Sequence, residues 1–228
     1  MVIGNGIVAT EFFDFKEDND VVLFASGVSN SRETLEANFK REENLLLDAL
    51  KEYSNGTFVY FSTCSIYDSS LNNSLYVNHK LNMERIIQEK ASKYKIFRIS
   101  NIVGKTPNPN TLTNYLANCI VNEKKFEVWR KATRNLIDII DIGKLVRGEL
   151  KRPQENNIVN IANSENYSLF EIVSGLEFAL EKQANYSVVD KGADFEIDIS
   201  YIKLFKEKLG VFFGENYLKE LLIRYYKK

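Results

Sequence analysis

The sequence has very little histidine and cysteine: one histidine, His79, and two cysteines, Cys64 and Cys119, stand among 228 residues. A single histidine argues against a His-based catalytic triad and against a His-rich zinc site. Two cysteines do not make a disulfide framework, and these two lack the spacing of metal ligands. We therefore expect a reducing compartment and no bound metal.

Long apolar runs and an excess of one charge are also absent. No apolar run approaches the roughly 18 residues of a membrane-spanning helix. The N-terminal segment Met1–Gly4 lacks the basic and apolar regions of a secretory signal. The formal net charge is -1, which argues against nucleic acid or an anionic membrane as the main partner. We therefore expect a cytoplasmic globular protein.

Short apolar segments alternate with long helical patterns over the first part of the chain. Apolar runs at 21–25, 58–61 and 94–99 suit buried strands, and helical spacing extends over about 31–53 and 75–92. Strands separated by whole helices are joined by right-handed crossovers and are therefore parallel. The pattern predicts an α/β protein built on a parallel sheet.

The second part of the chain has shorter and less regular elements. Ser168 and Glu171 have the spacing of a capping box at the start of a helix. No linker, internal repeat or low-complexity segment separates two independent domains, so we expect the C-terminal third to pack against the sheet. The elements expected here are strands at 126–129 and 158–161, a helix ending near 122, and helices over 141–150, 168–181 and from 199 onward.

The residues Gly4-Asn5-Gly6-Ile7-Val8-Ala9 read G-x-G-x-x-A. Glycines permit a tight turn and let the backbone approach a pyrophosphate, which the following helix N-terminus then binds. An ordinary turn is the alternative, because short glycine patterns are common. Only about ten residues separate Ala9 from Asp20 and the next strand, whereas a dinucleotide fold places an acidic ribose-binding residue on a second strand about 20 residues on. The segment that would bind adenosine is therefore predicted to be deleted or reduced.

A hydroxyl side chain, a tyrosine and a lysine follow the second apolar strand in that order. Thr63 stands just past the strand, where parallel sheets bind ligands. Tyr76 and Lys80 are spaced (i, i+4) and share one helical face. A nearby ammonium favours the phenolate and brings a phenol closer to the pKa range of efficient proton transfer. Such pairs also occur by chance as an exposed tyrosine beside a solvated lysine, but the order of these elements favours a proton-transfer site.

These motifs resemble the extended short-chain dehydrogenase/reductase family, in its NAD-dependent epimerase/dehydratase group that acts on nucleotide sugars. The resemblance runs over nearly the whole chain. The segments that carry it are Gly4–Ala9, Val21–Gly27, Asn38–Leu46, Ser62–Tyr67, Tyr76–Lys80, Arg98–Gly104, Phe126–Trp129, Arg134–Ile142, Asn160–Ser168 and Ile199–Gly210.

The resemblance implies NAD or NADP as the cofactor and a nucleotide sugar as the substrate. It implies that Tyr76 is the general acid/base, that Lys80 adjusts its pKa and binds the cofactor ribose, and that Thr63 orients the reacting oxygen. The cofactor-binding positions that it implies, besides Lys80, are Gly4, Gly6, Ile7, Ala25, Ser26 and Asn38. The substrate-binding positions that it implies are Ser65, Asn101 and Arg134.

The residues beside Thr63 narrow the reaction. Cys64-Ser65 stands where the 4,6-dehydratases of the family have Asp-Glu, which disfavours elimination of water. Ser65 and the lack of a second histidine argue against the 3,5-epimerase/reductases. We therefore predict NAD(P)-dependent reduction of a keto group, at C4, on a nucleotide-linked sugar. A nucleotide-sugar 4-epimerase with bound NAD, and a non-catalytic sugar-nucleotide-binding relative that has lost cofactor binding, stay open as alternatives.

The resemblance also implies how the chain is organised. We expect a Rossmann-like, doubly wound parallel sheet that lacks part of the second and third strands, with a small C-terminal α/β substrate subdomain. Residues 1–105 would form the cofactor-binding and catalytic part, and 106–228 mainly the substrate-binding part, with some segments returning to the sheet. Helices matching 31–53 and 75–92 pair across a two-fold axis in this family, so we expect a homodimer.

Three positions beside these motifs have their own interpretations. We expect Cys64 to be a small buried thiol, His79 to lie at the surface off the catalytic face, and Trp129 to pack inside the subdomain, with a wall for a uracil or other base as the alternative for Trp129. The helix motif of the family, N-x-x-G-T-x-N-L-L, departs in this chain, where Arg41 and Glu42 replace Gly-Thr.

Overall fold

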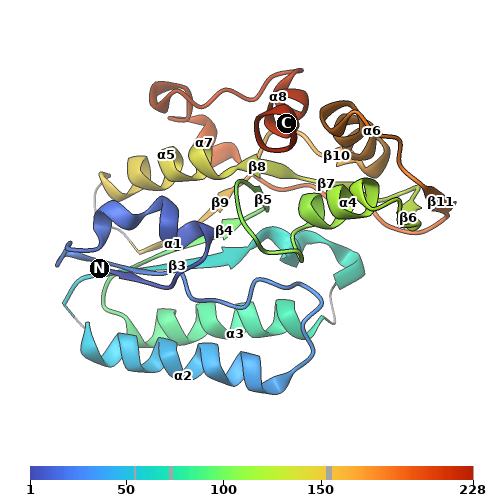
Figure 1. The fold of residues 1–228 in the computed structure, drawn as a ribbon. Helices are drawn as coiled ribbons and strands as arrows, with labels where there is room; N and C mark the ends of the chain where they lie inside the picture. Colours follow the sequence, from blue (N-terminus) through green and yellow to red (C-terminus); the bar gives the residue numbers. More distant parts are fainter. Residues whose placement is uncertain (54, 72–73, 153–155, 228) are drawn as a thin grey trace.

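The computed structural model describes residues 1–53, 55–71, 74–152 and 156–227. At its centre is one sheet of five strands in which all neighbouring strands are parallel, as predicted (Figure 1). The strands lie in the order β1 (Val2–Ile3), β2 (Val21–Phe24), β3 (Thr57–Thr63), β4 (Tyr94–Ile99) and β9 (Asn157–Ile161).

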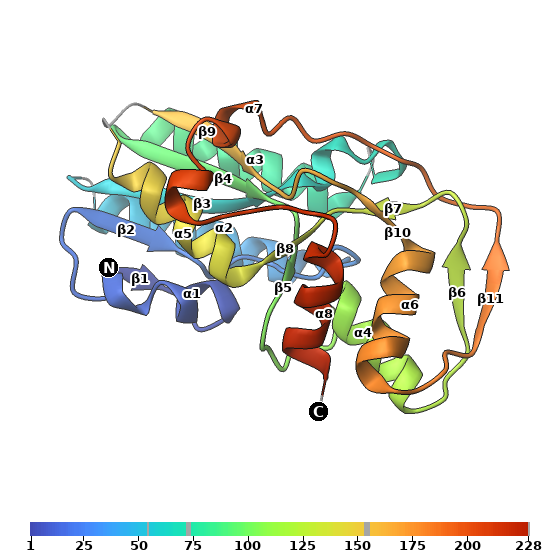
Figure 2. The ribbon, with the colours of Figure 1, turned by 90° about the horizontal axis from the view of Figure 1, so that it is seen from above.

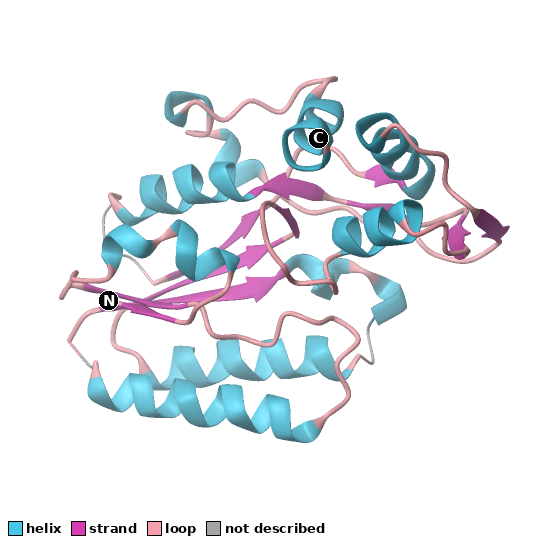
Figure 3. Cartoon of the chain, in the orientation of Figure 1, coloured by secondary structure: helices cyan, strands magenta, loops and turns pink. Residues whose placement is uncertain are grey.

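Helices cover both faces of this sheet (Figure 3). On one face lie α2 (Glu36–Glu52) and α3 (Leu75–Lys90), which contact each other and the sheet. On the opposite face lie α1 (Ile7–Glu11) and α5 (Ile139–Leu150). Because both faces are covered, the strands are rich in apolar residues, and every residue of β2 is apolar and buried.

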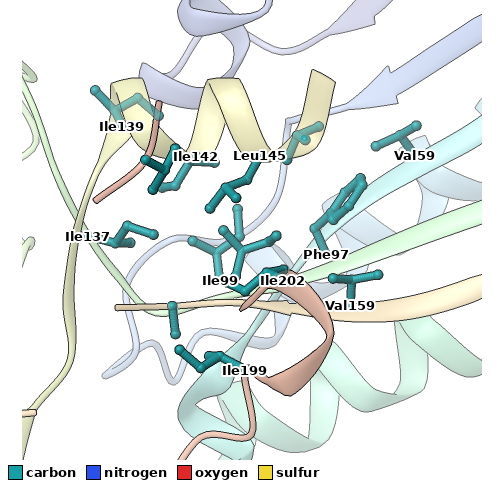
Figure 4. Close-up of a cluster of buried hydrophobic side chains, with 14 of the residues drawn as sticks. Val59, Phe97, Ile99, Ile137, Ile139, Ile142, Leu145, Val159, Ile199 and Ile202 are labelled. Atoms are coloured by element: carbon teal, nitrogen blue, oxygen red, sulfur yellow. The ribbon is translucent and has the colours of Figure 1, made fainter. Parts of the chain in front are cut away.

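One cluster of buried apolar side chains fills the space between the sheet and α5 (Figure 4). Phe97 from β4 and Ile142 and Leu145 from α5 are fully buried in it. On the other face, Leu46 from α2 and Met83 from α3 pack against the sheet. Each such side chain contributes about 1.5–3 kcal/mol relative to exposure, so these two clusters hold the three layers together.

The helix expected over 31–53 begins only at Glu36. The residues before it form turns instead, because their side chains accept hydrogen bonds from nearby backbone groups. The Asn30 side chain accepts from the N–H of Arg32, and the Glu33 carboxylate accepts from the N–H groups of Thr34 and Leu35. Such local bonds compete with helix formation, and helical spacing of apolar residues does not reveal them.

The strand β1 lies at the edge of the sheet and pairs with β2. The chain passes from β1 to β2 through the five residues of α1 and the short 3-10 helix η1 (Phe13–Phe15). This connection holds no further strand. The connection is short, as its sequence length requires, and β1 is an edge strand. That the adenosine-binding segment is reduced stays a prediction.

The C-terminal part has a core of its own beside the sheet. Three helices, α4 (Leu112–Val121), α6 (Leu169–Leu180) and α8 (Tyr217–Tyr226), pack together there. The capping box predicted at Ser168 and Glu171 is confirmed. In Figure 2 the pair β6 (Phe126–Trp129) and β11 (Tyr186–Val189) lies at the end of the molecule far from β1.

The remaining elements are short, and sequence pattern did not predict most of them, because two to four residues are too few to show a period. They are β5 (Asn101–Val103), β7 (Thr133–Arg134), β8 (Leu136–Asp138), β10 (Tyr167–Ser168), η2 (Cys64–Tyr67), η3 (Ser69–Leu71), α7 (Ser200–Lys203) and η4 (Glu207–Leu209). The tail after Ile199 is thus only partly helical.

The two parts expected at 1–105 and 106–228 are not cleanly separate in space. The strand β9 lies in the main sheet, and Ile199 and Ile202 pack into the cluster between the sheet and α5. The division at residue 105 and the homodimer through α2 and α3 stay predictions. Among the described residues, no helix has the length and apolar character needed to cross a membrane.

Candidate functional site

A cleft of about 820 Å³ opens at the carboxyl ends of the parallel strands. Its walls come from the loops after β1, β2, β3 and β4, and from the C-terminal part through Trp129, Arg134 and Ile197. Parallel sheets bind ligands at this edge, because the loops that follow successive strands meet there. The volume lies in the range of clefts that hold small-molecule ligands and cofactors. Trp129 both packs on the C-terminal core, as expected, and faces this cleft.

The glycine loop brings the end of β1 close to the end of β2. Gly4 has a φ of +134°, and a Cβ on it would lie 2.4 Å from the carbonyl oxygen of Ala25. Only glycine fits this backbone conformation and this approach. Gly6 and Ile7 line the cleft, as do Ala25 and Ser26. Four of the predicted cofactor positions therefore line one cleft. Gly4 contributes through its close approach to the backbone of Ala25.

The end of β3 presents the predicted hydroxyl and substrate residues. Thr63 and Ser65 both line the cleft. The Thr63 hydroxyl oxygen accepts a hydrogen bond from the Ser65 N–H at 3.0 Å, so its own proton is free to be donated. Between them, Cys64 is buried and its thiol donates to the Arg98 carbonyl. Burial raises the pKa of that thiol, which confirms Cys64 as an unreactive buried residue.

Tyr76 and Lys80 lie on the first turns of α3 and share the face predicted by their spacing. Both contribute to the cleft wall, although Tyr76 is only 8% exposed and Lys80 only 3%. The Lys80 ammonium lies 6.0 Å from the centre of the Tyr76 ring. The tyrosine, the lysine and Thr63 thus face one space, from a helix and a strand end that are adjacent along the chain.

The Lys80 ammonium has a carboxylate partner that sequence reasoning did not identify. Glu42 of α2 is completely buried, and its Oε1 lies 3.0 Å from Lys80 Nζ. The Tyr60 hydroxyl donates to the same Oε1 at 2.7 Å and accepts from Lys80 Nζ at 3.0 Å. On the other carboxylate oxygen, Oε2, the Val28 N–H donates at 2.6 Å and a His79 ring nitrogen lies at 3.0 Å.

These contacts keep Glu42 ionised inside the protein. Burial by itself raises the pKa of Glu42, but the Lys80 ammonium and the hydrogen bonds from His79, Val28 and Tyr60 outweigh it, so the pKa falls to about 2. The pKa of Tyr60 lies well above its usual value, because the phenol is fully buried and next to the Glu42 carboxylate. The positive charge of Lys80 is therefore matched by a negative charge at contact distance.

The position of His79 corrects an expectation. It was predicted at the surface, yet it is 9% exposed and lies against Glu42 and the Phe39 ring. On a helix, position 79 faces the same side as 76 and 80 closely enough to reach a neighbouring helix. The sequence does not show that α2 packs there. His79 was therefore predicted to be solvated, because its neighbours in sequence, Asn78 and Lys80, are also polar.

Two arginines lie close together across the cleft. Arg134, a predicted substrate ligand, contacts Asp68 at 3.6 Å. Burial lowers the pKa of Arg134, Asp68 raises it, and the charge of Arg32 lowers it again, which leaves it below the usual value. Arg32 was missed by the sequence analysis; its guanidinium lies 6.0 Å from the Tyr115 ring centre. Arg32 lies in the loop after the carboxyl end of β2, and this position could have marked it as a candidate ligand-binding residue, because such loops often hold binding residues.

Two predicted positions remain, Asn101 and Asn38, and only the first is among the described residues that line the cleft. Asn101 lines the cleft, and its amide donates to the Asn135 carbonyl at 2.9 Å. Asn38 does not stand among the described residues of the wall; its amide donates to Glu33 at 2.8 Å and holds the turn before α2. A cofactor contact by Asn38 stays a prediction. The described residues contain no cluster of three metal-ligating side chains.

Comparison with known proteins finds one curated relative of part of this sequence. The chain is 27% identical over 207 residues to a dTDP-D-glucose 4,6-dehydratase of Dictyostelium discoideum, in an alignment covering 76% of this chain and 46% of that protein. This chain therefore spans about half the length of the curated relative it matches.

Solved structures show the same fold. A UDP-glucuronic acid 4-epimerase from Bacillus cereus, in complex with UDP-glucuronic acid and NAD, superposes with a TM-score of 0.74 at 21% identity, over 97% of this chain and 79% of that one. A UDP-glucose 4-epimerase from Bifidobacterium longum, in complex with NAD+ and UDP, superposes with a TM-score of 0.71 at 17% identity, over 97% and 80%. A family model described as the NAD dependent epimerase/dehydratase family matches residues 10–162, and the chain belongs to that family.

Proposed function

We propose that this protein reduces a keto group on a nucleotide-linked sugar, with NADH or NADPH as a reductant that is bound and released in each cycle. The observation that supports this most is the meeting of Thr63, Tyr76 and Arg134 on the walls of one cleft at the carboxyl edge of the sheet. A proton donor, an orienting hydroxyl and an anion-binding group are what such a reaction requires from the protein.

The residues of the cleft fit the reacting half of a dinucleotide better than its adenosine half. Gly6, Ile7, Ala25 and Ser26 form a continuous wall beside Thr63, and the absence of a side chain at Gly6 leaves open space there. On the other side of β1 the sheet ends. We infer that the strands which carry adenosine contacts in the family fold are missing from this chain, so less cofactor surface is buried.

When bound, the cofactor supplies a hydride to the carbonyl carbon of the substrate. The protein's part is to position the carbonyl and to move a proton. The Thr63 hydroxyl donates to the carbonyl oxygen, since its own lone pair already accepts from Ser65. Tyr76 gives its phenolic proton to that oxygen as negative charge develops on it, and regains a proton from solvent through the open cleft.

The charge of the cleft favours an anionic substrate. Among the described residues of its wall, Arg32, Arg41, Lys80 and Arg134 are basic, and Asp68 is the single acidic residue. Glu42 balances Lys80 and Asp68 contacts Arg134, so the wall keeps a net positive charge from its arginines that attracts phosphate groups. We assign the diphosphate of the nucleotide sugar to Arg134 and Arg32, which both line the cleft and are near enough for the charge of Arg32 to lower the pKa of Arg134.

A 4-epimerase would have to retain one dinucleotide through both of its half-reactions. An edge strand at β1 leaves little surface to retain it, which favours a reductase over an epimerase. A second candidate is a sugar-nucleotide-binding protein without catalysis. The observation that favours it is the pairing of Lys80 with Glu42, because a lysine in an ion pair has less charge to offer a ligand.

Titration of the protein with NADH and NADPH, followed by cofactor fluorescence, tests the proposal. We expect binding in the micromolar to millimolar range, and oxidation of the bound cofactor when 4-keto sugars linked to UDP or dTDP are added. Tyr76→Phe should keep cofactor binding and lose turnover at least about 100-fold. The matched control Tyr186→Phe removes a hydroxyl from β11, which lies outside the cleft, and should keep both.

Failure of both cofactors to bind at millimolar concentration would overturn the reductase and support the non-catalytic candidate, provided that UDP or dTDP still binds.

A further inference from the structure

Glu42 lies at the centre of a buried polar cluster that joins α2, α3, β3 and the loop after β2. Both carboxylate oxygens are saturated: Oε1 contacts Tyr60 and Lys80, and Oε2 contacts Val28 and His79. All of these partners are within 3.0 Å. A buried carboxylate with four partners is held in one position, and so is each group that it holds.

Lys80 is equally committed. Its ammonium has three protons to donate, and two of them go to the Glu42 carboxylate and the Tyr60 hydroxyl. A ligand in the cleft is left with the third proton, and for the proton held by Glu42 it would have to compete with a charged carboxylate at 3.0 Å. A neutral hydroxyl competes poorly for that proton, because it offers the ammonium no opposite charge, whereas the carboxylate does.

The loop after β2 closes over the ion pair. A Cβ on Gly27 would lie 2.4 Å from Lys80 Nζ and 3.0 Å from Glu42 Oε1, so the backbone of Gly27 rests directly on both charged groups. The next N–H, from Val28, donates to Glu42 Oε2. The same loop residues line the cleft wall. Glu42 thus fixes at once the lysine and the loop that a cofactor would contact.

We propose that Glu42 is a positioning residue that, with Tyr60, withholds two of the three Lys80 protons from ligands in the cleft, so that this chain binds a dinucleotide with little grip from Lys80. The proposal rests on the proposed function for the identity of that ligand. It assigns weak dinucleotide affinity to two separate features, the Glu42–Lys80 pair and the edge position of β1. Of the two residues Tyr76 and Lys80 on α3, Tyr76 is then the one that contacts the reacting atoms.

The decisive variant is Glu42→Thr, which removes the carboxylate and restores the side chain that the resembled helix motif has at this position. Freed from its partner, Lys80 can donate to ligand hydroxyls, and we expect the Kd for NADPH or NADH to fall about tenfold, the equivalent of one charge-assisted hydrogen bond. The KM for the nucleotide sugar should stay unchanged. A merely structural glutamate gives the opposite result, equal or weaker cofactor binding.

Two further variants keep the test decisive. Glu43→Thr makes the same chemical change one residue along α2, outside the cluster, and should leave the Kd unchanged. The double variant Glu42→Thr/Lys80→Met has no buried charge left in the pair, which avoids an unpaired ammonium if Glu42→Thr fails to fold. In it we expect a Kd within about twofold of the unmodified chain, whereas a loss of tenfold or more shows that Lys80 does grip the cofactor and overturns the proposal.

A readout without any cofactor separates this proposal from the function. Acetylation of lysines by an N-hydroxysuccinimide ester, followed by mass spectrometry, measures the reactivity of Lys80 directly. We expect Lys80 to react at least about tenfold more slowly than in Glu42→Thr. Equal rates overturn the proposal. Failure of every variant to bind dinucleotide, with Lys80 still protected by Glu42, overturns the reductase function and leaves the positioning role of Glu42 standing.

Discussion

At the scale of single residues, the Glu42–Lys80 pair decides how this site differs from a free tyrosine–lysine pair. Removal of both charges from a buried pair often costs little stability, while removal of one partner leaves the other charge buried and unpaired. Glu42 and Lys80 are 0% and 3% exposed. The pair therefore fixes the positions of the two side chains, but its presence says little about the net free energy of unfolding.

The first prediction follows from this asymmetry. Lys80→Met leaves the Glu42 carboxylate buried without its cation, and we expect the free energy of unfolding to fall by about 3–5 kcal/mol. In Lys80→Met/Glu42→Gln a large part of this loss should return. Urea unfolding followed by circular dichroism measures both. The control is Lys40→Met, which breaks the exposed Lys40–Glu36 pair and should change little. Equal losses in the single and double variants would contradict the argument.

The second prediction concerns acid. The pKa of Glu42 falls from the usual 4.5 to about 2 on folding, because Lys80 and three hydrogen bonds favour the ionised form more than burial disfavours it. A carboxyl whose pKa is lower in the folded state stabilises the fold above its unfolded pKa, and this contribution is lost as the pH falls. We therefore expect stability to decline between about pH 5 and pH 2.

Urea unfolding of the Glu42→Gln variant over that pH range measures the contribution. The decline in its free energy of unfolding should be shallower than in the unmodified chain, and Glu43→Gln should keep the full slope. A Glu42→Gln profile parallel to that of the unmodified chain would contradict this assignment of the acid sensitivity.

At the scale of elements, the turn between β1 and α1 shows two glycines with different reasons for being there. Gly4 has a positive φ and touches the Ala25 carbonyl, while Gly6 has ordinary backbone angles and open space around it. Gly4 is required by its backbone conformation and its close approach to Ala25, whereas Gly6 leaves open space in the cleft.

The third prediction contrasts these two positions. Gly4→Ala forces a side chain into the backbone of Ala25, directly after β2, and we expect a loss of about 2 kcal/mol or more in the free energy of unfolding. Gly6→Ala should stay within about 1 kcal/mol, yet weaken the binding of a dinucleotide, because its methyl group enters the cleft. Thermal unfolding and NADPH titration distinguish the two effects. A tolerated Gly4→Ala would show that the loop rearranges freely.

At the scale of the whole molecule, the cleft is completed by parts of the chain that are far apart in sequence. The loops after β1 to β4 form one side, and Trp129, Arg134 and Ile197 come from the C-terminal part. The core of that part, together with β9 and α7, holds these residues against the sheet. Neither part makes the complete cleft by itself.

The fourth prediction tests the electropositive wall. Arg134→Met removes a half-buried guanidinium from the cleft, and we expect the affinity for UDP or dTDP to fall about tenfold or more. The affinity should also become less sensitive to salt, since one charge contact is lost. Calorimetric titration at two salt concentrations measures both effects. Arg130→Met, four residues earlier and outside the wall, is the control; an equal loss there would point to long-range charge rather than contact.

Sequence pattern predicted the parts of this protein that depend on local chemistry. The apolar runs that became β2, β3 and β4 are recognisable because a strand buried on both faces is rich in consecutive apolar residues. The (i, i+4) spacing of Tyr76 and Lys80, the capping box at Ser168, and the short connection after Ala9 are also local. Together with the order of the motifs they were enough for the family, which the comparison then confirmed.

The tertiary structure decided what those residues face. Glu42 and Lys80 are 38 residues apart, on helices that meet only because both pack on one face of the sheet. His79 changed from an expected surface residue to a buried one for the same reason, and Arg32 joined Arg134 through a loop that periodicity does not describe. Sequence by itself determined the long elements and the family, and it predicted the proton-transfer residues, because all of these predictions rest on local spacing and motif order. Which charge neutralises the lysine, and which groups share the cleft, depended on packing between distant segments, because electrostatic contacts act through space.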